Sequence, residues 1–169
     1  MIVLHLTSAS FDSGAGIGVL NLHSAMLARG IDSRLYSVFS VNKDVPESVI
    51  SYSSNVTRVI AKFNYWSHRF LMKSLGYRGG NTFSLLTRGP TWPSSSELQG
   101  ADIIHLHWVG NSFLNETNLE GLSAKVVWTM RDWWPLTGGC HIPGECTQFL
   151  TQCGSCPLLP YDFLFNLAE

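Results

Sequence analysis

The feature that most restricts how this chain can fold is a short apolar run followed at once by a glycine-rich turn and a helical pattern. Residues 2–6, IVLHL, have the length and composition of a buried strand. The glycine stretch 14–18, GAGIG, leads into a helix predicted over 19–28, which Gly30 ends, and 32–40, DSRLYSVFS, returns as a second strand. A strand, a helix and a strand in this order form a right-handed βαβ unit, so the two strands are predicted to be parallel.

Two further apolar runs, 101–110 (ADIIHLHWVG) and 124–130 (AKVVWTM), have strand character, and 111–123 between them is long enough for a short helix. Near-continuous apolar strands are typical of a sheet that is covered on both faces. A chain of 169 residues that is 45% hydrophobic can bury one core of this kind. The predicted fold is therefore α/β, with a doubly wound, mostly parallel open sheet. The segment 87–100 is predicted to be a loop.

Residues 56–75 give the clearest helical pattern, an apolar stripe with a basic arc beside it. Two interpretations are open: a helix whose stripe packs in the core and whose basic face is solvated, or a surface that meets anionic lipid or a phosphorylated acceptor. The stripe consists of Val59, Ile60, Phe63, Trp66 and Phe70, and the arc of Arg58, Lys62, Arg69 and Lys73.

The net charge of −1 provides no overall field that would recruit nucleic acid, so no nucleic-acid partner is expected. The balance is uneven, because residues 48–96 hold six Lys or Arg and no Asp or Glu. The N-terminus lacks a secretory signal, and no apolar run is long enough to span a membrane. These features predict a cytoplasmic protein, with peripheral contact to the inner face of the membrane through the basic helix 56–75 as an additional possibility.

The glycine stretch has two interpretations. Backbone N–H groups at the start of a helix attract phosphate, and glycines allow a ligand to approach closely; alternatively, the glycines serve only a tight turn with close helix packing. The spacing of Gly14, Gly16 and Gly18 is not that of the dinucleotide fingerprint, and no acid follows the second strand. A nicotinamide-dependent oxidoreductase is therefore disfavoured.

In open α/β sheets, ligands bind beyond the carboxyl ends of the strands, where residues from several segments converge. His105 and His107 alternate along their strand and should point to the same face. His105 is predicted to be a hydrogen-bonded core residue, and His107 to be a functional candidate. The residues predicted to share this rim are 14–18, His107, Trp108, Arg131 and Asp132.

The four cysteines follow the pattern C-x5-C-x6-C-x2-C, with His141 directly after the first. Three states are open: a structural zinc site, thiols that are only packed, and disulfides, which a reducing compartment disfavours. In each state the cysteines hold an irregular loop in place and have no catalytic role. They are Cys140, Cys146, Cys153 and Cys156.

Three segments, 13–38 (SGAGIGVLNLHSAMLARGIDSRLYSV), 101–114 (ADIIHLHWVGNSFL) and 126–157 (VVWTMRDWWPLTGGCHIPGECTQFLTQCGSCP), together resemble the N-terminal domain of retaining GT-B glycosyltransferases of family four. They are most similar to a bacterial branch that acts on surface polysaccharides. The resemblance implies a Rossmann-like domain of a hexosyltransferase. Such an enzyme transfers a sugar from a nucleotide-sugar donor to a glycan or lipid-linked acceptor with retention, and no catalytic metal or other cofactor is required.

The resemblance also implies roles for the rim residues. Gly14, Gly16 and Gly18 would line the cleft, while His107 and Arg131 would contact sugar or phosphate. Asp132 would orient Arg131 or an acceptor hydroxyl, Trp108 would bind substrate, and Trp133 would stack on a sugar face unless it or Trp134 is a core residue. The family has histidine at the position of Arg131.

The resembled enzymes have a second Rossmann-like domain that carries most nucleotide contacts. Residues 1–169 are therefore expected to be the acceptor-side domain of a larger enzyme, with the donor-binding domain missing and little activity alone. The alternative is a non-catalytic α/β binding module with a zinc-stapled loop, which recognises a glycan, a lipid phosphate or a protein.

Overall fold

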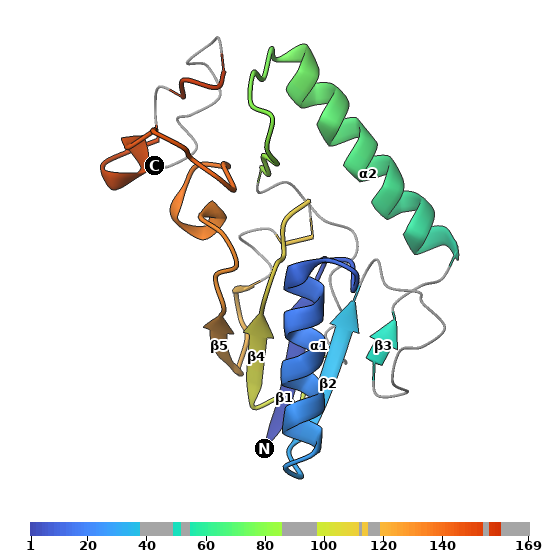
Figure 1. The fold of residues 1–169 in the computed structure, drawn as a ribbon. Coiled ribbons are helices and arrows are strands. Elements are labelled where there is room, and N and C mark those ends of the chain that lie inside the picture. Colours follow the sequence, from blue (N-terminus) through green and yellow to red (C-terminus); the bar gives the residue numbers. More distant parts are fainter. Residues whose placement is uncertain are drawn as a thin grey trace.

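A computed structural model shows a five-stranded sheet in which every neighbouring pair of strands is parallel, in the order β3-β2-β1-β4-β5 (Figure 1). The predicted α/β class is confirmed. The strands are β1 (Ile2–Thr7), β2 (Asp32–Ser37), β3 (Val49–Ser51), β4 (Ile103–Leu106) and β5 (Lys125–Trp128), and the helices are α1 (Gly14–Leu27) and α2 (Asn55–Ser74). The structure describes residues 1–37, 49–51, 55–85, 98–111, 113–114, 119–153 and 156–159.

The centre of the sheet is covered on both faces. On one face, α1 places Val19 against Leu35 of β2. On the other face, a larger cluster contains Tyr36 of β2, together with Phe113 and Trp134 from the segments that follow β4 and β5. The edge strand β5 departs from this pattern, because its valines at 126 and 127 are 42% and 44% exposed. The prediction of two covered faces is therefore wrong for β5, because this strand lies at the edge of the sheet.

Helix α1 begins at Gly14, five residues earlier than predicted, so the glycine stretch lies within its first two turns. The cause is an N-cap: the Ser13 hydroxyl accepts a hydrogen bond from the backbone N–H of Gly16 at 3.2 Å. Gly16 packs so closely that a Cβ there would lie 2.0 Å from the Ser10 carbonyl oxygen. At Gly16, the tight-turn interpretation of the glycines is the one that the structure supports.

Helix α2 matches the predicted range to within one residue at each end. Of the two interpretations of its apolar stripe, the one in which the stripe packs in the core is wrong. Phe63, Trp66 and Phe70 are 70%, 65% and 74% exposed. The helix is attached to the domain through Met72, which is 4% exposed and packs against Phe83. At 100° per residue, Met72 lies on nearly the opposite side of the helix from the stripe. In Figure 1, α2 lies at the periphery, away from the sheet.

Several expectations concern segments that the structure describes only in part. Most of the loop at 87–100, the last three residues of the strand predicted over 32–40 and the side chain of Arg58 lie outside the described residues. So do residues 112 and 115–118 of the short helix expected at 111–123. Among the helices that are described, none combines the length and apolar character needed to cross a membrane.

Candidate functional site

Three segments meet at the carboxyl edge of the sheet, as the sequence predicts. Arg131 follows β5, His107 follows β4, and Gly18 lies in the second turn of α1. The Arg131 guanidinium is 3.4 Å from the Nδ1 atom of His107, and it occupies the space that a side chain at Gly18 would need. This convergence of β4, β5 and α1 defines the candidate site.

Arg131 is held by neutral neighbours. A Cβ at Gly18 would lie 2.6 Å from Nη1 of Arg131, so the absence of a side chain there makes room for the guanidinium. Within the described part of the chain, no carboxylate forms a salt bridge with Arg131. The side chain is exposed, so its unpaired positive charge is available to an anion such as a phosphate.

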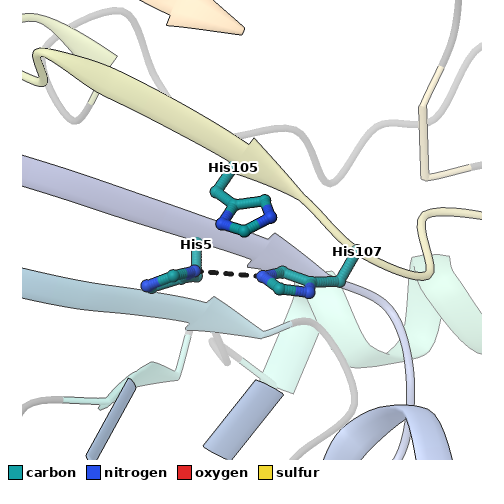
Figure 2. A group of neighbouring side chains, drawn as sticks. All are labelled: His5, His105 and His107. Carbon is teal, nitrogen blue, oxygen red and sulfur yellow. Dashed lines mark hydrogen bonds between the residues drawn. The ribbon is translucent and has the colours of Figure 1, made fainter. Parts of the chain in front are cut away.

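His107 is buried and connects Arg131 to the interior. Because a guanidinium can only donate, the Nδ1 atom of His107 acts as the acceptor and Nε2 carries the proton. The Nε2–H group then donates to Nδ1 of His5 at 3.0 Å, as Figure 2 shows. His105 lies on the same face of β4, with its ring centroid 4.2 Å from that of His107, and pairs through Nε2 with the Thr129 hydroxyl at 2.7 Å. The predicted common face of His105 and His107 is confirmed, and His105 is hydrogen-bonded as predicted, although it is only partly buried.

Within the described residues, these three histidines are the only set of three or more His, Cys, Asp or Glu side chains whose potential metal-ligand atoms lie within 4.8 Å of one another. A cation between them would break the hydrogen bond from His107 to His5 and would lie beside the Arg131 guanidinium. The hydrogen bond and the neighbouring guanidinium therefore favour a cluster without a cation.

Burial keeps these imidazoles neutral. It lowers the pKa of His5 to about 3 and that of His107 to about 2, and the proximity of His105 lowers both further. Burial also lowers the pKa of His105, with a smaller contribution from Arg131.

These pKa values predict destabilisation by acid. The unfolded chain binds a proton at His5 and His107 below about pH 6.5 and the folded protein does not, so stability is full above that pH and falls as the pH decreases towards 3. Each histidine should contribute a slope of about 1.4 kcal/mol per pH unit. Urea unfolding between pH 5 and pH 8 measures the slope, and NMR titration of the imidazoles provides the control. If both imidazoles titrate near their ordinary pKa of about 6.5, the assignment is wrong.

Asp132 is the centre of a second network. Its Oδ2 atom accepts from the indole N–H of Trp108 at 2.7 Å and lies 2.6 Å from Nδ1 of His141, and its Oδ1 atom accepts from the backbone N–H of Trp134 at 3.0 Å. The expected pairing of Asp132 with Arg131 is not present, because its oxygens face these other partners. The carboxylate thus ties the strand ends of β4 and β5 to the cysteine-containing loop.

The network continues from His141 to Ser84, whose hydroxyl lies 2.8 Å from Nε2 of the imidazole. Aspartate, histidine and serine in this order have the contacts of a hydrolase triad. However, Ser84 is 1% exposed and its oxygen accepts from the backbone N–H of Asn111. The array therefore orders the loop and does not present a nucleophile.

A cavity of about 510 Å³ lies beside this network, between the chain that follows β1 and helix α2. Trp108, Lys62 and Tyr65 line it together with residues from 8–15. The three glycines expected to line a cleft do not line this cavity. Trp134 is a core residue, 6% exposed, whereas Trp133 is 48% exposed and lies near Phe149 outside the cavity.

The cysteine-containing loop holds four free thiols. Cys140 donates a hydrogen bond to Cys156, which raises the pKa of Cys140 and lowers that of Cys156 to about 6. Cys153 lies against Gly138, where a Cβ would be 2.9 Å from that of the cysteine. Cys140 and Cys156, at the two ends of the loop, are thus in contact with each other. The four sulfur atoms are nevertheless less closely grouped than the ring nitrogens of His5, His105 and His107.

His141, Ser84 and His5 are site residues that the sequence analysis did not identify. Two of them carried a signal: His141 directly follows the first cysteine, and His5 interrupts the apolar run of the first strand. Ser84 carried none, because it reaches the site from a stretch with no recognisable motif.

Comparison with known proteins identifies a distant relative. The chain is 25% identical, over 94% of its length, to the Escherichia coli (strain K12) protein named "Putative colanic acid biosynthesis glycosyl transferase WcaC". The chain spans 40% of the length of that protein. No family model matches the chain. No solved structure matches it.

Proposed function

We propose that this chain is the acceptor-side, Rossmann-like domain of a retaining GT-B glycosyltransferase in polysaccharide biosynthesis. The enzyme would transfer a hexose from a nucleotide sugar to a glycan or lipid-linked acceptor. The observation that carries the proposal is the exposed Arg131 at the carboxyl edge of a parallel sheet, where α/β proteins bind ligands and where no described carboxylate pairs with it. The similarity to the E. coli protein along nearly the whole chain supports it.

In this proposal, Arg131 neutralises a phosphate of the nucleotide-sugar donor. A second domain would supply most of the other contacts to the donor. His107 is 1% exposed, so it acts as a positioning residue that accepts from the guanidinium. Asp132 and His141 fix the loop that carries Trp108 at the cavity, and the cavity receives the acceptor. Trp133 is exposed and free to stack on a sugar ring.

The complete protein tests the proposal. It should release a nucleoside diphosphate and transfer labelled sugar to a lipid or polysaccharide extract from one member of a panel of nucleotide sugars. The anomeric configuration of the product, measured by NMR, should equal that of the donor. Inversion would contradict the retaining mechanism, and the absence of transfer with every donor would contradict the transferase.

The proposal includes a structural zinc ion held by Cys140, Cys146, Cys153 and Cys156. Four thiolates are a donor set that suits zinc, and the contact between Cys140 and Cys156 already brings the first and last cysteines together. Cys146 and Cys153 would have to move closer to complete a tetrahedral site.

We expect about one zinc ion per chain, measured by elemental analysis of protein purified without added metal. A chelator should lower the Tm, because a structural zinc ion contributes directly to folding. The Cys146→Ser variant should lose most of the metal, and the exposed Ser67→Ala variant serves as its control. A zinc content well below one per chain would remove the metal from the proposal.

A further inference from the structure

The outer face of α2 carries large apolar side chains that nothing in the described structure covers. We call this line of side chains the α2 ridge: Val59, Phe63, Trp66 and Phe70, which are 66%, 70%, 65% and 74% exposed. They recur at intervals of three and four residues, so they form one continuous line along the helix. Contiguous exposed apolar surface of this kind is typical of an interaction site.

Beside the α2 ridge runs a line of cations. Lys62, Arg69 and Lys73 are exposed, and at 100° per residue they lie about 70° around the helix from the ridge. Arg69 contacts only the Tyr65 side chain among the described residues, 3.2 Å from the phenol oxygen and 5.7 Å from the ring centre. The stretch 48–96 contains six Lys or Arg and no acidic residue. The partner of this face must therefore combine an apolar interior with negative charge.

The helix is fixed to the domain from its other side, which leaves the α2 ridge exposed. Trp66 and Phe70 also line the rim of an open cavity of about 590 Å³ between α2 and the segment that contains Phe83. Met72 packs in a cluster with Phe83, and Nε2 of His68 accepts from the backbone N–H of Leu85 at 3.4 Å. Burial lowers the pKa of His68, which favours the neutral imidazole that this acceptor role requires. The 20-residue helix is too polar to span a bilayer. An aromatic ridge flanked by cations is instead typical of a helix that lies in the headgroup region of a membrane.

We propose that the outer face of α2 binds the surface of an anionic lipid bilayer. Phe63, Trp66 and Phe70 enter the headgroup and acyl boundary, while the cations contact lipid phosphates. Lys62 and Tyr65 of the same helix line the cavity beside Trp108, so a docked α2 brings this cavity close to the membrane. If the proposed function holds, on which this conclusion rests, the arrangement favours a lipid-linked acceptor.

Flotation with lipid vesicles tests the docking. The purified protein should float with phosphatidylcholine–phosphatidylglycerol vesicles, remain unbound with phosphatidylcholine alone, and dissociate as salt is added. The Phe63→Ser/Phe70→Ser variant should lose binding. The Arg69→Gln/Lys73→Gln variant should bind about fivefold more weakly for each cation removed. Emission from Trp66, isolated by comparison with Trp66→Phe, should shift to the blue and be quenched by brominated acyl chains.

Arg29→Gln/Lys125→Gln is the matched control, because it removes the same charge from exposed positions on other elements. Equal weakening by the control would show attraction by net charge alone and would overturn the proposal. A second outcome is a wild type that forms a dimer and fails to bind vesicles, while the Phe63→Ser/Phe70→Ser variant is monomeric. That result would assign the ridge to contact with a second copy of the chain and would overturn the membrane proposal. Circular dichroism confirms folding of each variant. Transfer to a water-soluble acceptor should survive the loss of vesicle binding, which separates this proposal from the proposed function.

Discussion

Replacement of Gly16 by alanine should lower the free energy of unfolding by about 2–4 kcal/mol and the Tm by about 5–15 °C. The new Cβ would lie 2.0 Å from the Ser10 carbonyl oxygen and 2.7 Å from the Phe11 Cα atom. Both are backbone atoms, and the Ser10 carbonyl is held in place by the backbone N–H and the hydroxyl of Ser13 at 3.0 and 2.6 Å. Relief of the clash therefore requires α1 to move away from the chain that follows β1.

The neighbouring glycines provide the matched controls for unfolding by urea and by heat. Nothing lies within 4 Å of a Cβ at Gly14, so Gly14→Ala should change stability by less than about 0.5 kcal/mol. At Gly18 the Cβ would meet only the end of the Arg131 side chain, which can turn away, so Gly18→Ala should also remain close to the wild type in stability. Similar losses at all three positions would show that helix backbone effects, and not the contact with Ser10, determine the result.

Replacement of Arg131 by alanine should reduce the transfer rate of the complete protein about 10²–10³-fold, because the proposed donor phosphate loses its cation. The fold should be unaffected, since Arg131 is exposed and forms no salt bridge among the described residues. Measurement of kcat and KM for the nucleotide-sugar donor, beside a thermal melt, separates the two effects. Activity within about threefold of the wild type would contradict a phosphate contact.

Two further variants sharpen this test. Gly18→Ala should displace the guanidinium while keeping its charge, and a displacement of about 1 Å can cost 10²-fold in rate. Arg131→His introduces the residue that the resembled family has at this position. We expect it to lose activity, because a shorter imidazole cannot place the same fork of donors above Gly18. A gain of activity would instead identify Arg131 as a loss-of-function substitution.

The sequence predicted the sheet and its edge because those features are local. Three of the five strands, β1, β4 and β5, are short apolar runs, and β2 follows from its place after the first helix. The positions of His107 and Arg131 after two of the apolar strands place both residues at the carboxyl edge. The short strand β3 was missed, since three residues at Val49–Ser51 are too few to show a period. The start of α1 was placed too late because Gly14, Gly16 and Gly18 have low helix propensity, which the Ser13 cap and the close packing at Gly16 override.

The remaining differences depend on tertiary contacts. The periodicity of α2 identified an apolar stripe, but it could not show that Met72, on the other side, attaches the helix to the domain. Likewise, the sequence places Asp132 beside Arg131 but cannot show that the carboxylate faces Trp108 and His141. The position of a residue after a predicted strand shows that it lies near the site. The direction in which its side chain points depends on partners that are far away in the sequence.

The fit between Gly18 and the Arg131 guanidinium has an evolutionary consequence. The arginine uses space that exists only while position 18 has no side chain, so the two positions share one volume. A homologue with alanine or a larger residue at position 18 should therefore have a shorter side chain at position 131, and a long arginine there should accompany glycine. The pair should change together across related sequences, although 113 positions along the chain separate its two members.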